Sequence, residues 1–187
     1  MRRRHPLPRL WLMTDERMSE EGLWDALARL PRGSGVVFRH YRASDRRALF
    51  ERVRMIARRR RLVLLLGGTP REAAGWRADG AHGRSPHLRA ARPLIRTAPA
   101  HHQRELAHAR AHAVFLSPVF PTRSHPDAVP LGLLRFGMLA RATRIPLVAL
   151  GGMDARRFHR LAQLGAYGWA AIDALVDAAN TVRRAPK

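Results

Sequence analysis

Short apolar runs alternate with segments of helical period along the whole chain, and this alternation restricts the fold more than any other feature. Eight runs read as strands, at 10–15, 35–41, 62–68, 78–83, 93–99, 113–120, 146–153 and 168–175. Most are continuously apolar, which is typical of strands buried on both faces of a parallel sheet. The pattern predicts an α/β protein, a single compact (β/α)8 TIM barrel spanning residues 1–187.

The segments between the runs carry helical signals. Apolar residues recur at helical spacing within 20–30, 45–60, 69–76, 101–112, 133–143 and 155–165. Ser19, Ser44 and Asp154 stand where side-chain caps would begin three of these helices. Such barrels typically have about 200 residues or more. A chain of 187 residues therefore needs trimmed helices, above all after the fourth strand. An open doubly wound sheet is the alternative.

The composition excludes several kinds of chemistry. Without cysteine the chain has no disulfide, thiolate metal site or cysteine nucleophile, which agrees with the cytoplasmic location that we expect. No apolar run is long enough to cross a bilayer, so no membrane partner is predicted.

The charge balance is strongly basic, with 35 Lys and Arg residues against 14 Asp and Glu residues, which suggests a nucleic-acid partner. The arginines are, however, spread over almost every polar segment. The one compact run, at 57–62, falls at the end of a predicted helix, where the helix dipole favours cations. We therefore expect no specific nucleic-acid partner. A nonspecific polyanion-binding protein, whose affinity falls steeply with salt, is an alternative function.

Polar residues follow several of the predicted strands. In a parallel barrel, the groups that bind ligand lie at the carboxyl ends of the strands or in the loops just after them. These positions hold Thr14, Asp15, Arg39, Tyr41, His82, Thr122, Arg123, Ser124, His125, Gly151, Gly152 and Asp173. The paired glycines would let backbone N–H groups approach an anion closely. The stretch SPVFPTRSHP (117–126) sets hydroxyl and basic side chains next to one another, as a phosphate site requires.

Structural interpretations compete with these assignments. His82 can be a hydrogen-bonded interior histidine, residues 122–125 an ordinary polar turn, and Asp15 a cap for the next segment. Four residues of one predicted helix recur at metal-ligand spacing, namely His101, Glu105, His108 and His112. They would face outward on a barrel helix, so no protein metal site is predicted.

Six segments resemble, in order and spacing, the landmarks of thiamine phosphate synthases and the related TenI-type proteins. They are LWLMTDE, GVVFRHY, ADGAH, SPVFPTRSHP, LVALGGM and GWAAIDAL. The resemblance spans almost the whole chain, and PVFPT-x-S is its most specific part. It implies a (β/α)8 barrel of thiamine biosynthesis that joins an aminopyrimidine diphosphate to a thiazole phosphate and releases pyrophosphate. It also implies Mg²⁺ as cofactor when the protein is active, and the two phosphorylated ligands as partners.

The resemblance assigns roles to individual residues. Arg39 matches an arginine that serves the diphosphate, and the hydroxyls of Thr122 and Ser124 match the loop that holds pyrophosphate or the thiazole end of the ligand. Gly151 and Gly152 match the phosphate-binding glycines. Arg123, beside the matched hydroxyls, can add a bidentate contact to phosphate.

Other family positions differ in this chain. Val37 and Tyr41 stand in place of the glutamine and lysine around the matched arginine, and His125 in place of the loop lysine. Gly67 and Gly68 replace the Asn-Asp pair that serves the diphosphate and metal. Asp173 replaces the serine of the last strand, and Pro118 the histidine of the TenI-type proteins. The metal-binding aspartate expected shortly after His82 is absent from GRSPHL. A degenerate TenI-like barrel that binds thiamine phosphate, or a related phosphate, is therefore a second alternative function. His82 and His125 are the candidates for moving a proton, and Asp173 would stand near the thiazole phosphate.

Overall fold

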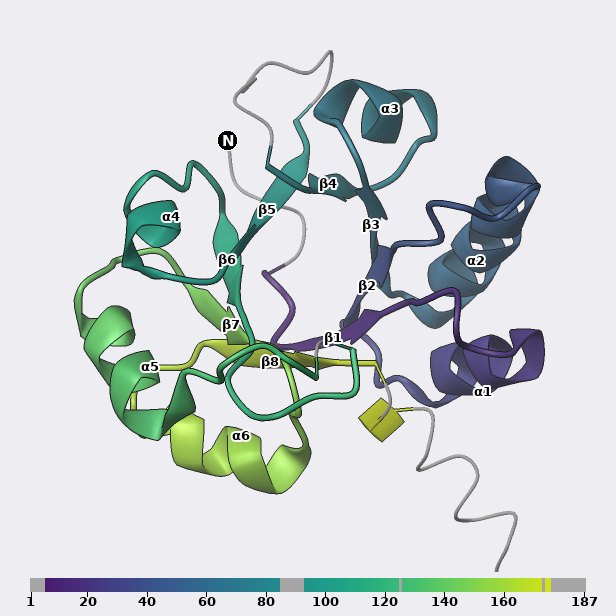
Figure 1. Ribbon diagram of the computed structural model, residues 1–187. Coiled ribbons are helices and arrows are strands. Elements are labelled where there is room, and N and C mark those ends of the chain that lie inside the picture. Colours follow the sequence, from purple (N-terminus) through teal and green to yellow (C-terminus); the bar gives the residue numbers. More distant parts are fainter. Residues whose placement is uncertain (1–5, 85–92, 125, 173, 176–187) are drawn as a thin grey trace, which may run out of the picture.

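The computed structural model of the chain describes residues 6–84, 93–124, 126–172 and 174–175. Its strands are β1 (Leu10–Met13), β2 (Gly35–Phe38), β3 (Val63–Gly67), β4 (Gly80–His82), β5 (Ile95–Ala100), β6 (Ala113–Leu116), β7 (Leu147–Ala149) and β8 (Gly168–Ala171). Each strand pairs in parallel with the next, and β8 pairs with β1, so the sheet closes into a barrel (Figure 1). The predicted barrel is confirmed, and the open doubly wound sheet is wrong.

Helices surround the barrel (Figure 1). They are α1 (Glu20–Arg29), α2 (Arg46–Arg60), α3 (Pro70–Gly75), α4 (Gln103–Ala107), α5 (Gly132–Arg141) and α6 (Ala155–Ala162). Helices α3 and α4 have only six and five residues, and such short helices let a chain of this length complete a barrel. The shortened helix expected after the fourth strand falls mainly on residues 85–92, which lie outside the described part of the chain. No helix of the described residues is long and apolar enough to cross a membrane.

Side-chain caps begin the helices as the sequence suggests, with one correction. The Ser19 hydroxyl accepts the N–H of Gly22 at 3.1 Å, and the Asp154 carboxylate accepts the N–H of Arg157 at 2.8 Å. At α2 the cap is Asp45, which accepts the N–H of Ala48, rather than Ser44. The two adjacent residues are both good caps, and the helix begins one residue later than the pattern indicated.

Two of the three apolar clusters lie between the sheet and the helices, and the third fills the barrel. The interior cluster takes alternate residues of the strands, among them Trp11, Val37 and Phe115. The Trp11 and Phe115 rings meet edge to face, with centroids 5.4 Å apart. A Cβ on Gly35 would overlap the Trp11 ring, so the glycine makes room for the tryptophan. The interior is therefore a packed core, and ligand space is left at the ends of the strands.

All eight strands are shorter than the predicted runs, and the ends of three of them shape the site. The runs 113–120, 146–153 and 168–175 continue in sequence, but the strands end at Leu116, Ala149 and Ala171. The chain leaves the ladder near Pro118, which has no N–H to donate, and near the glycines at 151 and 152, which have positive φ. These loops are thereby turned over the carboxyl end of the barrel.

Candidate functional site

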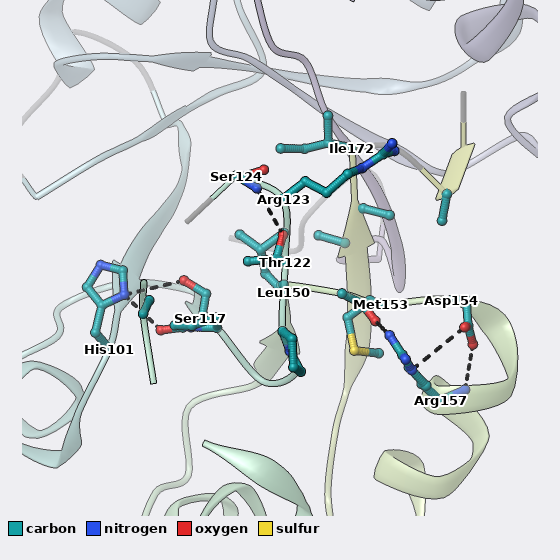
Figure 2. A pocket seen from close by; sticks show the side chains of 18 of the residues that line it. His101, Ser117, Thr122, Arg123, Ser124, Leu150, Met153, Asp154, Arg157 and Ile172 are labelled. Carbon is teal, nitrogen blue, oxygen red and sulfur yellow. Dashed lines mark hydrogen bonds and ion pairs between the residues drawn. The ribbon is translucent and has the colours of Figure 1, made fainter. Parts of the chain in front are cut away.

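A cavity of about 350 Å³ lies at the carboxyl end of the barrel, formed mainly by the loops after β6, β7 and β8 (Figure 2). Six residues predicted from the sequence line it, namely Arg39, Thr122, Arg123, Ser124, Gly151 and Gly152. They come from three separate segments of the chain. Closure of the barrel brings them together, because the carboxyl ends of parallel strands all lie at one end.

The loop after β6 folds back against the loop after β7. The N–H groups of Val119 and Phe120 donate to the carbonyls of Leu150 at 2.9 Å and Gly151 at 3.1 Å. Further along, Thr122 Oγ1 accepts the N–H of Ser124 at 3.4 Å (Figure 2). This turn holds two hydroxyl groups on the cavity wall, where they can bind an oxyanion.

The paired glycines make this close packing possible. Gly151 and Gly152 have φ values of 92° and 58°, a region that L side chains rarely adopt. A Cβ on Gly151 would lie 2.8 Å from Pro118 Cα, and one on Gly152 would overlap the Pro121 carbonyl oxygen. Both residues line the cavity. The backbone of these two glycines, which carry no side chain, therefore borders the space where an anion would bind.

Helix α6 begins beside these glycines and adds a cation. The Arg157 guanidinium donates to the Gly152 carbonyl oxygen and lies 4.8 Å from the centroid of the Phe120 ring. Its Nε is 3.8 Å from Asp154 Oδ2, and both residues line the cavity (Figure 2). Arg157 was not predicted. It stands in a polar helix among other arginines. Its position only a few residues after the paired glycines was the one sequence signal that it could reach the cavity.

Arg39 extends from the end of β2 and is held at two points. Its backbone N–H donates to Thr14 Oγ1 at 2.9 Å, and its Nη2 lies 3.6 Å from Asp15 Oδ2. Thr14 is fully buried, and its hydroxyl also makes a 3.0 Å hydrogen bond with His40 Nδ1. Arginine presents five N–H donors, and Arg39 lines the cavity, so its guanidinium can offer further donors to a ligand there.

Asp15 connects two arginines at this end of the barrel. It accepts hydrogen bonds from Arg17 through Nε at 2.7 Å and the backbone N–H at 3.1 Å. Burial by itself would raise the pKa of Asp15, but the Arg17 hydrogen bonds and the charges of Arg17 and Arg39 outweigh it, so the pKa is lowered. The carboxylate is ionised at neutral pH and offsets part of the positive charge around Arg39.

His82 is buried inside the barrel and does not line the cavity. Its Nδ1 makes a 2.9 Å hydrogen bond with Thr97 Oγ1, and its ring meets Phe115 edge to face at 4.9 Å. Burial, and then the charge of Arg39, lower the pKa of His82 to about 3. The ring is therefore neutral at pH 7. The structure agrees with the interpretation as an interior histidine, and a catalytic role stays a prediction.

Two predicted site residues, His125 and Asp173, lie outside the described part of the chain. The four residues at metal-ligand spacing within 101–112 do not share one helix, because α4 covers only Gln103–Ala107. His108 Nδ1 bonds the Arg104 carbonyl, whereas His112 Nδ1 accepts the N–H of Arg96. Among the described residues, no three His, Asp or Glu side chains could hold a metal ion together.

His101 is a cavity residue that was considered only as part of that helix. Its Nδ1 lies 2.8 Å from the Ser117 carbonyl oxygen and 3.4 Å from Ser117 Oγ, and both residues line the cavity (Figure 2). His101 directly follows β5, so it stands at the carboxyl end of a strand. That position was the signal that could have identified it.

Comparisons with known proteins agree with the resemblance seen in the sequence. The profile of the family described as "Thiamine monophosphate synthase" matches residues 10–175. A protein of Aquifex aeolicus (strain VF5) named "Putative thiamine-phosphate synthase 2" is 30% identical over 184 residues, which is 91% of this chain and 99% of that protein. A "Thiamine-phosphate synthase" of Latilactobacillus sakei is 36% identical over 66 residues, covering 35% of this chain and 30% of that protein.

Solved structures share the fold. The thiamine phosphate pyrophosphorylase of Pyrococcus furiosus superposes with a TM-score of 0.72 at 22% identity, covering 95% of this chain and 94% of that one. The thiamine phosphate pyrophosphorylase of Bacteroides thetaiotaomicron gives 0.61 at 16% identity, covering 90% and 85%. At such low identity these structures establish the barrel alone.

Proposed function

The chain belongs to the thiamine monophosphate synthase family, and on that premise we propose that it joins an aminopyrimidine diphosphate to a thiazole phosphate and releases pyrophosphate. One observation supports this proposal above all. The backbone of Gly151 and Gly152, the hydroxyls of Thr122 and Ser124, and Arg39 line one cavity at the carboxyl end of the barrel. Backbone N–H groups, hydroxyls and guanidinium groups are the donors that phosphates require.

The proposed roles follow from these positions. The backbone at 151 and 152 binds the thiazole phosphate. Arg39 and the loop 122–124 stabilise the negative charge that develops on the departing pyrophosphate, which is the main catalytic task in such a transfer. Arg39 is the residue best placed for it, because its backbone is fixed by the buried Thr14 hydroxyl. No covalent intermediate is needed.

The described residues of this chain do not fit the Mg²⁺ that the family uses. Carboxylates commonly bridge Mg²⁺ to phosphates, but Gly67 and Gly68 stand where the family has its Asn-Asp pair. Asp15 is engaged with two arginines, and no metal-binding cluster exists among the described residues. The transfer that we propose therefore depends on arginine side chains for charge stabilisation, and none of its steps involves a metal ion.

A second candidate function is binding without turnover, and one contact favours it. A Cβ on Gly67 would lie 2.6 Å from Tyr41 Oη, so the tyrosine fills the space beside the glycine. The Arg46 guanidinium donates to the Gly67 carbonyl at 2.7 Å and lies 5.4 Å from the centroid of the Tyr41 ring. Tyr41 and Gly67 stand where the family has polar residues for the diphosphate. Such packing favours a barrel that binds thiamine phosphate, or a related phosphate, as a sensor or carrier.

A single-turnover assay separates the two candidates. Purified protein is mixed with the aminopyrimidine diphosphate and the thiazole phosphate, with Mg²⁺ or with EDTA, and product formation and thiazole phosphate binding are measured on the same sample. We expect product in both conditions, and a rate about 100-fold lower in Arg39→Ala. The control is Arg135→Ala, at an exposed position on α5.

Each other outcome has a clear meaning. Product that appears only with Mg²⁺ would contradict the role given to the arginines. Binding of thiazole phosphate without product would establish the second candidate. Absence of both would show that this chain has lost the function of its family, although the barrel is retained.

A further inference from the structure

A second cavity, of about 420 Å³, lies between α2 and α3 at the other end of the barrel. Its wall includes Leu62 and Leu64 at the start of β3, and Asp79 immediately before β4. It shares no lining residue with the cavity at the carboxyl ends. The two cavities therefore occupy opposite ends of the strands.

Three arginines converge on this second cavity from two directions. Arg54 and Arg58 stand one turn apart on α2, and Arg77 comes shortly after α3. The one carboxylate in the described wall is Asp79, whose Oδ2 accepts the N–H of Leu64 at 2.8 Å. The wall thus carries an excess of positive charge.

The Arg54 guanidinium is only partly paired within the described chain. Its Nε and Nη2 both lie 2.6 Å from Glu51 Oε2, and the other oxygen of Glu51 binds Arg47 at 2.7 Å. Arg54 Nη1 is buried and has no hydrogen-bond partner in the described part of the chain. A buried donor of a charged group is destabilising without an acceptor. The negative end of the α2 dipole favours the positive charge of Arg58, which lies in the last turn, but it does not supply an acceptor for Arg54.

Arg77 occupies a backbone position that glycine normally fills. Its φ is 57°, the left-handed conformation that commonly follows the end of a helix. Glycine would adopt this conformation more easily, so Arg77→Gly removes the guanidinium group while relieving the backbone. This variant can separate an effect on binding from an effect on folding.

We propose that this cavity is a second ligand site, which binds a compact phosphate anion of diphosphate size through Arg54, Arg58 and Arg77. Guanidinium groups grip phosphate oxygens through paired N–H donors, and a concave wall suits a small anion. A nucleic-acid strand would instead need an extended basic groove with aromatic rings for stacking. The described wall of this cavity contains no aromatic residue. The site is independent of the function proposed for the other cavity.

Isothermal titration with inorganic pyrophosphate tests the proposal. The full chain is used in an Arg39→Ala background, which weakens the carboxyl-end cavity. We expect Arg54→Gln and Arg77→Gly each to weaken pyrophosphate binding about tenfold, because each removes hydrogen bonds to a charged ligand. The matched control is Arg71→Gln, an exposed arginine of α3 outside the wall, which should leave the affinity unchanged.

Two results would overturn the proposal. One is an affinity that Arg54→Gln and Arg77→Gly leave unchanged, or that Arg71→Gln lowers equally. The other is tighter binding of a short single-stranded RNA than of pyrophosphate, which would indicate a general polyanion surface. If Arg54→Gln does not fold, as judged by circular dichroism, Arg77→Gly decides the question by itself.

Discussion

Arg17 Nη2 donates a hydrogen bond to Ser124 Oγ at 2.8 Å, although the two residues are 107 positions apart. The same guanidinium binds Asp15 through Nε, and Asp15 faces Arg39. A chain of charged and hydroxyl groups thus joins the loops after β1, β2 and β6 at the cavity. We therefore expect Arg17 to orient the Ser124 hydroxyl toward a ligand that Arg17 itself does not contact.

Replacing Arg17 should therefore weaken ligand binding more than it weakens folding. For Arg17→Gln we expect a thiazole phosphate Kd about three- to tenfold higher, since the Ser124 hydroxyl loses its fixed orientation. The free energy of unfolding should change by less than about 1 kcal/mol, because the Arg17 side chain is half exposed. Calorimetric titration and urea denaturation measure the two quantities. A Kd equal to that of Arg135→Gln would show that the bridge does not matter.

Thr14 should be sensitive to the loss of its hydroxyl group alone. Thr14→Val keeps the shape of the side chain but leaves the N–H of Arg39 without its acceptor and His40 Nδ1 without its partner. We expect a loss of about 1–3 kcal/mol in the free energy of unfolding, as for other buried unsatisfied groups. Thr14→Ser keeps the hydroxyl and should lose clearly less. Equal losses for valine and serine would assign the effect to packing.

The stability of the fold should decrease in mild acid. Burial and then Arg39 lower the pKa of His82 to about 3, whereas an unfolded chain has a histidine pKa near 6.5. Between these values the unfolded chain binds a proton that the folded chain does not, so acid favours unfolding. The free energy of unfolding should fall below about pH 6.5, by about 2 kcal/mol from His82 at pH 5. The pKa of His40 is also lowered, mainly by burial, so His40 acts in the same direction.

Urea denaturation at pH 7.5 and pH 5.0 checks this dependence, in a range where most carboxylates stay ionised. His82→Gln retains a group that can bond Thr97 but has no titrating ring, so it should show the smaller pH effect. If its stability falls as much as that of the unaltered chain, His82 is not the source.

The end of α2 offers a stabilising substitution. Arg61 adopts φ 56° and ψ 42°, and its N–H bonds the carbonyls of Ala57 and Arg58. A non-glycine residue in this left-handed conformation is strained by about 1–2 kcal/mol. Glycine also loses more entropy on folding, so Arg61→Gly should stabilise by roughly 0.5–1 kcal/mol in net terms. Thermal unfolding measures the change. Arg61→Ala is the control, and it should show no gain.

Gly152 should not tolerate a side chain. A Cβ there would overlap the Pro121 carbonyl oxygen, and φ is 58°. Gly152→Ala should lower stability by about 1–3 kcal/mol and weaken thiazole phosphate binding, because the loop after β6 must move away. Gly75→Ala is the matched control, since a Cβ on Gly75 meets no atom within 4 Å. Differential scanning calorimetry and titration would contradict this expectation if both variants behaved alike.

Part of the site could be predicted because its signals are local. Gly151 and Gly152 are adjacent glycines directly after an apolar run, and Thr122 to Ser124 follow a strand that ends near a proline. In a parallel barrel such positions must lie at the ligand-binding end. Arg17 and Arg157 gave no comparable signal, because arginine occurs in almost every polar segment of this chain. Their roles depend on where long, flexible side chains come to rest.

The sequence by itself determined the barrel, since eight mostly apolar runs separated by helical segments can bury both faces of each strand in few other ways. It also indicated which loops line the cavity at the carboxyl end. The tertiary structure decided which side chains meet there: it placed His82 in the core, His101 on the cavity wall and Tyr41 against Gly67. The physical reason is the distance along the chain over which each kind of interaction acts. Apolar periodicity acts between near neighbours along the chain, whereas contacts such as Arg17 to Ser124 exist only after the first and last strands have closed the barrel.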